Sequence, residues 1–118
     1  MIVSIDFDDT FTVDPVAWTA IIKLLQNASH TVVCVTGRKD TPASANQIKT
    51  ALPDGVAVVF AGSDPKNDAA MRQGFHVDVW IDDRPSRVMG KAVVGKAMSN
   101  DPWRARQVLN RRMQKHRG

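Results

Sequence analysis

Short apolar runs alternate with amphipathic stretches over the first 83 residues of the chain. The runs are rich in β-branched residues and apolar on both faces, which is typical of buried strands. We expect strands over residues 1–5, 31–36, 56–60 and 77–81. The stretches between them predict helices over residues 15–27, 42–52 and 65–74. Each predicted helix begins at an Asp-Pro or Thr-Pro pair, which supplies an N-cap and a proline at the first helical position.

The first predicted helix is defined by an apolar stripe. Its members are Val16, Ile21, Ile22, Leu24 and Leu25. The second predicted strand is a continuous apolar run with Cys34 at its middle, between valines. We therefore expect the Cys34 side chain to lie in the core.

The alternation predicts an α/β protein with a mostly parallel sheet that helices cover on both faces. Right-handed crossovers favour a doubly wound, three-layer α/β/α sandwich as the most economical topology. The pattern weakens after Pro85, where residues 91–95 predict a short edge strand and residues 101–117 predict a basic helix. At 118 residues the chain is expected to form one domain, residues 1–118.

The charge of the chain is divided between an acidic body and a basic end. Residues 1–83 hold six Lys/Arg and eleven Asp, a net charge of −5, and residues 84–118 hold ten Lys/Arg and only Asp101, a net charge of +9. A basic segment attached to an acidic body indicates a polyanionic partner. The alternative is a solvated tail, and charge alone does not separate the two.

The cysteine count and the hydropathy pattern indicate a cytoplasmic protein. A single cysteine, Cys34, excludes an intramolecular disulfide and a cysteine-based zinc site, and it fits a reducing compartment. The first acid comes at Asp6, which is too early for a signal peptide. The longest uncharged apolar run, residues 56–61, is too short to span a bilayer. We therefore expect no membrane partner.

Polar clusters follow the predicted strands at the points where they end. They are Asp6, Asp8, Asp9 and Thr10 after the first strand, Thr36 and Arg38 after the second, and Asp82 and Asp83 after the fourth. Ligands of parallel sheets bind outside the carboxyl ends of the strands, so we expect the first and fourth strands to be neighbours and their acids to share one crevice.

Several carboxylates in one crevice repel each other unless a cation neutralises them. Oxygen ligands without His or Cys favour Mg²⁺, which typically binds one or two carboxylates together with a substrate phosphate. Lys66 and Thr36 then supply a positive charge and a hydroxyl for the remaining phosphate oxygens. The residues thus predict a metal-assisted site for phosphoryl transfer.

At this point the chain resembles the haloacid dehalogenase (HAD) superfamily of aspartyl phosphotransferases. The first motif of that family, Asp-x-Asp-x-Thr after a hydrophobic strand, is matched by Asp6-Phe7-Asp8-Asp9-Thr10. The hydroxyl that closes the next strand is matched by Thr36, the lysine by Lys66, and the acidic pair by Asp82-Asp83. The four motifs occur in the family's order within residues 1–95, and the resemblance implies an HAD-like Rossmannoid fold.

The resemblance implies a role for each matched acid. Asp6 would be the nucleophile that forms an aspartyl-phosphate, and Asp8 the general acid that later activates water. Mg²⁺ would be held by Asp6, by the backbone carbonyl of Asp8 and by Asp82. An Asp at the position of Asp8 is similar to the phosphatases of the family, whereas its ATPases carry Thr there. Thr10 and Asp83 would support the site from outside the metal's ligands, and a cap of the next turn is the alternative role for Asp83.

The remaining matched residues would bind the phosphoryl group. The resemblance assigns this role to Thr36 and Lys66, and Lys66 would also stabilise the ionised nucleophile. Arg38 and Arg72 are the alternatives to Lys66. Arg38 also follows Thr36-Gly37 into the expected mouth of the site, which makes it a candidate for contact with the substrate.

The spacing of the motifs indicates a protein without a cap domain. Residues 11–14 alone separate the first motif from the next helix, and residues 39–66 hold one helix and one strand. An open site suits substrates too large to be enclosed, such as phosphorylated nucleic-acid ends, or else a second subunit acts as the lid. Residues 82–88, Asp-Asp-Arg-Pro-Ser-Arg-Val, are similar to the segment after the acidic pair in the 3′-phosphatase domains of polynucleotide kinases. The basic helix over residues 101–117 agrees with that substrate.

Three hypotheses follow. The leading one is a Mg²⁺-dependent phosphomonoester hydrolase that acts through an aspartyl-phosphate on a nucleotide or a nucleic-acid end. The second is a non-catalytic binding module that docks on nucleic acid or a protein partner through its basic C-terminal helix. The third is a phosphotransferase whose acceptor is not water, which the sequence does not separate from a hydrolase. Assembly as a homo-oligomer is compatible with each of them.

Overall fold

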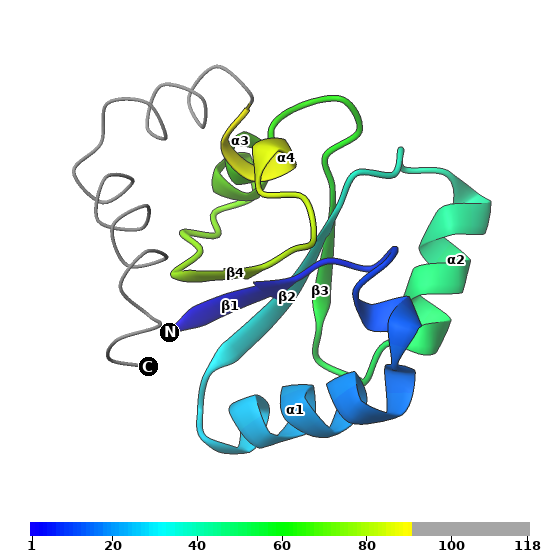
Figure 1. Ribbon diagram of the computed structural model, residues 1–118, viewed down its shortest axis with the longest axis vertical. Helices are drawn as coiled ribbons and strands as arrows, with labels where there is room; N and C mark the ends of the chain where they lie inside the picture. Colours follow the sequence, from blue (N-terminus) through cyan, green and yellow to red (C-terminus); the bar gives the residue numbers. More distant parts are fainter. Residues whose placement is uncertain (91–118) are drawn as a thin grey trace, which may run out of the picture.

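Strands and helices alternate along the protein, and the strands form one central sheet (Figure 1). The computed structural model describes residues 1–90. The strands are β1 (Ile2–Ile5), β2 (Thr31–Thr36), β3 (Ala57–Phe60) and β4 (Val79–Ile81). The helices are α1 (Pro15–Asn27), α2 (Pro42–Ala51), α3 (Lys66–Arg72) and α4 (Ser86–Met89), with a 3₁₀ turn, η1 (Phe11–Val13), before α1. The predicted edge strand over residues 91–95 and the basic helix over residues 101–117 lie outside the described residues.

The sheet has the strand order β3-β2-β1-β4, and every pair in it is parallel. In the register of the sheet Val3 of β1 is paired with Val32 on one side and with Val79 on the other. The chain moves outward from β1 to β3 and then crosses to the opposite edge for β4. This order confirms the predicted parallel sheet and the predicted neighbours β1 and β4, and it places the topological switch point between these two strands.

Helices cover both faces of the sheet, so the fold has the predicted three layers (Figure 1). Successive residues of a strand point to opposite faces, and β2 supplies both cores. Cys34 packs with residues of α1 and α2 on one face, whereas Val33 and Val35 pack with residues of α3 on the other. These three side chains are fully buried, and a buried aliphatic side chain such as Val contributes roughly 1.5–3 kcal/mol. The core position expected for Cys34 is confirmed.

Only part of the apolar stripe of α1 reaches the core. Ile22 is buried and Leu25 packs against the same cluster, but Val16 and Leu24 are 83% and 68% exposed. The residues that contact the sheet are Trp18, Ile22 and Leu25, which are spaced four and three residues apart and therefore share one line along the helix. A single helix laid on a sheet buries such a line, and apolar residues beside it stay in solvent.

No cap domain interrupts residues 1–90. Between Thr10 and α1 the chain forms only η1, and between β2 and α3 it forms only α2 and β3 with their loops. The predicted absence of an inserted cap is therefore confirmed at both places where a cap was considered. None of the helices that the structure describes is long and apolar enough to cross a membrane.

Candidate functional site

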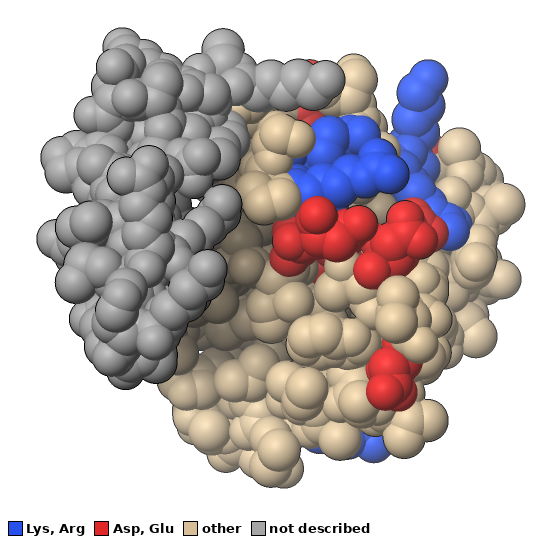
Figure 2. Space-filling view, viewed as in Figure 1, with Lys and Arg blue, Asp and Glu red and all other residues tan. Residues whose placement is uncertain are grey.

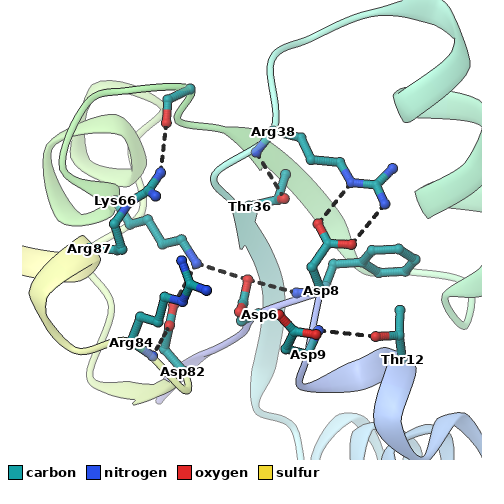
Figure 3. Close-up of polar contacts among 12 residues, drawn as sticks. Asp6, Asp8, Asp9, Thr12, Thr36, Arg38, Lys66, Asp82, Arg84 and Arg87 are labelled. Carbon is teal, nitrogen blue, oxygen red and sulfur yellow. Dashed lines mark hydrogen bonds and ion pairs between the residues drawn. The ribbon is translucent and has the colours of Figure 1, made fainter.

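The loop after β1 presents two acids at the edge of the sheet. The backbone N–H of Asp6 donates to the carbonyl of Ile81 (2.9 Å), so the ends of β1 and β4 lie side by side. Phe7 turns into the core, where its ring stacks on that of Phe11 with centroids 5.8 Å apart. Because Phe7 is anchored in the core, the side chains before and after it project toward the mouth of the site (Figure 3).

Two further hydrogen bonds shape this loop. The N–H of Phe11 donates to the carbonyl of Asp6 (3.2 Å), and the N–H of Asp9 donates to Oγ1 of Thr12 (3.1 Å). Asp9 adopts φ +60°, a conformation that Asp tolerates better than most residues. The side chain of Thr10 is buried, and its Oγ1 has no hydrogen-bond partner among residues 1–90. Thr10 therefore lies beneath the site without contacting its acids through a hydrogen bond.

Lys66 joins the acids of β1 and β4. From the first turn of α3 its Nζ donates to Oδ1 of Asp6 (2.8 Å) and to Oδ2 of Asp82 (2.6 Å) (Figure 3). The side chains of Lys66, Asp6 and Asp82 are 5%, 8% and 4% exposed. Charges this deeply buried are tolerated because they are paired. The topology thus brings together three of the residues that the sequence assigned to one site.

A third carboxylate completes an acidic cluster. Oxygen atoms of Asp6, Asp82 and Asp83 lie within 4.8 Å of one another. Oδ1 of Asp6 accepts from Lys66 and from the N–H of Phe7, whereas its Oδ2 accepts no hydrogen bond from the described residues. A carboxylate oxygen without a hydrogen bond, beside two further carboxylates, gives an all-oxygen donor set, which suits a hard divalent cation. This cluster can hold a metal ion.

Burial dominates the electrostatics of Asp6. It raises the pKa of this carboxyl from its ordinary 3.8 to about 6, with Lys66 opposing the rise and the negative charge of Asp82 adding to it. A divalent cation at the cluster would favour the ionised form of Asp6. The charge state of this residue therefore depends on whether a cation is bound.

The Asp8 carboxylate has a different partner. It accepts from Nε and from Nη2 of Arg38, each at 2.8 Å, while Nη1 of Arg38 donates to Oε1 of Gln47 at 2.7 Å. The guanidinium also lies over the ring of Phe7, 5.3 Å from its centroid. The two hydrogen bonds from Arg38 hold the pKa of Asp8 below its ordinary value. Arg38 thus lies at the mouth of the site, where the sequence predicted it, but it is paired with a predicted catalytic acid.

Thr36 closes β2 next to this pair. Its side chain is buried, and its Oγ1 accepts from the backbone N–H of Arg38 at 3.2 Å. The hydroxyl proton of Thr36 is therefore free to donate to another group. The role in phosphate binding that the sequence assigned to Thr36 stays a prediction.

These residues surround a polar cavity of about 240 Å³ at the carboxyl edge of the sheet. Its lining residues are Asp6, Asp8, Asp9, Gly37, Arg38, Lys66, Asp82, Asp83, Arg84 and Arg87. Figure 2 shows acidic and basic side chains gathered next to each other on one face of the molecule. Pockets that enclose a drug-sized ligand typically measure about 300–1,000 Å³. This smaller cavity suits a compact anion, with the remainder of a larger molecule left in solvent.

Arg84 and Arg87 were not among the candidates for the site. Both line the cavity from the segment that follows β4. The backbone N–H of Arg84 donates to Oδ1 of Asp82 (2.8 Å), and Nη2 of Arg87 donates to the carbonyl of Gly62 (3.3 Å). The signal that could have found them was present in the sequence, because both belong to the segment over residues 82–88 that carries the second resemblance.

Comparison of the chain with protein-family models, with curated proteins and with solved structures finds no match. Function is therefore inferred from the fold and from the geometry of the acidic cluster.

Proposed function

We propose that the protein is a Mg²⁺-dependent phosphomonoester hydrolase of the HAD superfamily, which acts on a nucleotide or a nucleic-acid end. One observation carries the proposal. Asp6 and Asp82 come from opposite ends of the described chain and meet on the single ammonium group of Lys66, with Asp83 beside them. A parallel sheet with these residues at the ends of adjacent strands is the arrangement that a metal-assisted phosphoryl transfer needs.

The residues of the cluster fit Mg²⁺. Asp6, Asp82 and Asp83 offer carboxylate oxygens, and the backbone carbonyl of Asp8 is the further ligand that the HAD resemblance implies. When bound, the cation supplies positive charge that neutralises the phosphoryl oxygens and the attacking carboxylate.

In the proposed reaction the carboxylate of Asp6 attacks phosphorus. The new Asp6–phosphorus bond forms as the bond to the leaving oxygen breaks, and protonated Asp8 gives its proton to that oxygen. Asp8 then accepts a proton from a water molecule that attacks the aspartyl-phosphate, which releases inorganic phosphate and restores both acids. Lys66 keeps Asp6 ionised and binds a phosphoryl oxygen, because an anion that attacks an anion needs positive charge nearby.

The cavity is compatible with a large substrate. It is open at the sheet edge, and no cap domain covers it within residues 1–90. A phosphate at the end of a polymer enters such a site while the polymer stays outside. This accessibility supports an end group or a nucleotide over a small metabolite that must be enclosed.

The proposal is tested by phosphate release from an aryl phosphate, with Mg²⁺ and with a chelator, in the wild type and in Asp6→Asn. The expected result is Mg²⁺-dependent release by the wild type and its loss in the variant. Asp64→Asn is the matched control, because Asp64 is an exposed acid paired with Arg72 and does not line the cavity. Equal activity in the wild type and in Asp6→Asn contradicts the proposal. Salt-dependent binding to single-stranded DNA, without turnover of any phosphoester, supports the binding module instead.

A further inference from the structure

Two of the four arginines in the described chain have no carboxylate partner. Arg38 and Arg72 form ion pairs with acids, at 2.8 Å in both cases, whereas the guanidinium groups of Arg84 and Arg87 form none within residues 1–90. Within the described part of the chain, the one hydrogen bond of the Arg87 side chain is the 3.3 Å contact to the Gly62 carbonyl. Both residues line the cavity, so the site contains positive charge that the neighbouring acids do not engage.

The guanidinium group of Arg87 lies directly against Gly37. A Cβ atom at this position would lie 2.8 Å from Nη2 of Arg87, closer than non-bonded atoms approach. Gly37 is not among the residues with positive φ, so a larger residue here would meet no backbone strain and would instead displace the flexible end of the Arg87 side chain. Gly37 directly follows Thr36, so the Arg87 guanidinium packs on the turn that leaves β2, at the edge of the cavity.

The turn that leads into α4 sets the spacing of the pair. Arg87 follows Arg84 by three residues, and its backbone N–H donates to the Arg84 carbonyl at 3.0 Å. Residues three apart in a helical turn lie on one side of it, which explains why both side chains reach the same cavity. Lys66 is buried at the base of the cavity, whereas Arg84 is exposed at its rim. The two arginines therefore form a positive region that lies nearer to solvent than Asp6, the proposed nucleophile.

The charges around the cavity show what this region can bind. Of residues 1–90, five Asp and four cationic residues line it, and two of the cations, Lys66 and Arg38, are held by carboxylates. A bound divalent cation changes the net charge of the lining from negative to positive. The guanidinium groups of Arg84 and Arg87 are then available for an anion, and the planar donor fork of Arg matches the oxygens of a phosphate.

We propose that Arg84 and Arg87 form a second anion subsite, which binds a phosphate group on the leaving-group side of the substrate. This inference rests on the proposed function and narrows its substrate class. The preferred substrate is a phosphate monoester whose alcohol carries another phosphate, as in a nucleoside bisphosphate or a phosphorylated oligonucleotide end. The scissile phosphate lies beside Asp6 and Lys66, and the additional phosphate lies at the rim formed by the two arginines.

The test compares kcat/KM for substrates with one and with two phosphates, measured as phosphate release in Mg²⁺. The one-phosphate substrates are adenosine 3′-monophosphate and adenosine 5′-monophosphate. The two-phosphate substrates are adenosine 3′,5′-bisphosphate and dinucleotides phosphorylated at the 3′ or the 5′ end. We expect the second phosphate to raise kcat/KM by about tenfold or more, the effect of one charge-assisted hydrogen bond. A preference confined to the bisphosphate or to the dinucleotides identifies the source of the second phosphate.

Two variants then test the subsite, one by removing a charge and the other by moving it. Arg87→Gln removes the charge, and Gly37→Ala keeps it but displaces the guanidinium from its place. Each is expected to reduce the preference for two phosphates by about fivefold or more. Arg72→Gln is the matched control, because Arg72 is exposed and lies outside the cavity, and it should leave the preference intact. Thermal unfolding of each variant verifies that it is folded.

The outcomes separate the two proposals. If the wild type releases phosphate from no substrate, including the aryl phosphate, the proposed function fails. If it hydrolyses all of them without preference, or with a preference that folded Arg87→Gln retains, the anion subsite is refuted while the hydrolase stands. Loss of the preference in both Arg87→Gln and Gly37→Ala supports the subsite.

Discussion

Arg38 binds Asp8 through two parallel hydrogen bonds of 2.8 Å, which join the loop after β2 to the loop after β1 across the mouth of the cavity. The side chains are 25% and 47% exposed, so water screens the pair and limits its contribution to stability to about 1 kcal/mol or less. The pair is therefore easy to open. The pair mainly affects the protonation of Asp8. The proposed role of Asp8 as an acid requires a proton, and Arg38 lowers the pKa of this carboxyl.

The first prediction concerns this pair. Arg38 lowers the pKa of Asp8, so Arg38→Gln should let that pKa rise toward its ordinary value. An acid is active when protonated, and the high-pH limb of kcat should therefore move to higher pH in the variant. The measurement is a pH–rate profile with an alkyl phosphate, whose poor leaving group needs the proton.

The control for this prediction is Asp8→Asn, alone and combined with Arg38→Gln. Removal of the acid should reduce turnover of the alkyl phosphate by about 10²–10⁴-fold, and the Arg38 substitution should then cause no shift of the limb. A profile that is identical in the wild type and in Arg38→Gln would show that Arg38 does not control the proton on Asp8.

The second prediction concerns Lys66. Lys66→Met leaves Asp6 and Asp82 buried without their shared cation, which should lower the free energy of unfolding by about 3–5 kcal/mol in a metal-free buffer. Mg²⁺ should restore part of this loss, because it neutralises the same carboxylates. The measurement is urea denaturation with a chelator and with Mg²⁺.

Lys49→Met is the matched control for Lys66→Met, because Lys49 is an exposed lysine in the last turn of α2. Its substitution should change the free energy of unfolding by less than about 0.5 kcal/mol. A loss in Lys66→Met that is the same size with and without Mg²⁺ would argue against a shared cation site.

The third prediction is the pH dependence of metal binding. The pKa of Asp6 is raised to about 6, so below this pH a proton occupies the carboxyl and must leave when a cation binds. The apparent affinity for Mg²⁺ should therefore be nearly constant above pH 7 and should fall by roughly tenfold for each pH unit well below 6. Isothermal titration calorimetry at several pH values measures it, and Asp6→Asn should bind weakly with a flatter profile. Equal affinity at pH 5 and pH 7 would exclude Asp6 as a ligand.

The fourth prediction concerns Cys34. Burial in β2 raises the pKa of its thiol to about 12, so almost no thiolate forms at pH 8. The folded protein should react with iodoacetamide far more slowly than the protein unfolded in urea, as mass spectrometry can measure. Mg²⁺ should leave the slow rate unchanged. Rapid labelling of the folded chain would contradict the buried position of Cys34.

Local pattern was sufficient to predict the four strands, the helices α1, α2 and α3, and the parallel sheet, but it predicted neither η1 nor α4. Continuous β-branched runs such as residues 31–36 are apolar on both faces, so they are buried only in a strand that helices cover on both sides. Each of the predicted helices begins at a pair of residues that contains proline. The sequence did not show which apolar residues of α1 are buried against the sheet. Val16 and Ile22 are both apolar, and the position of the sheet decides which of them is buried.

The sequence by itself determined which acids and which hydroxyl stand at the strand ends, because these residues end or directly follow the apolar runs, and it placed Lys66 at the start of the helix before β4. Tertiary structure alone decided their partners. Lys66 bridges Asp6 and Asp82 because β4 crosses back to lie beside β1, and the guanidinium of Arg87 lies against Gly37 because the segment after β4 and the turn after β2 border the same cavity. Such contacts join segments far apart along the chain, and their distances depend on strand order and loop geometry, which no local pattern of residues encodes.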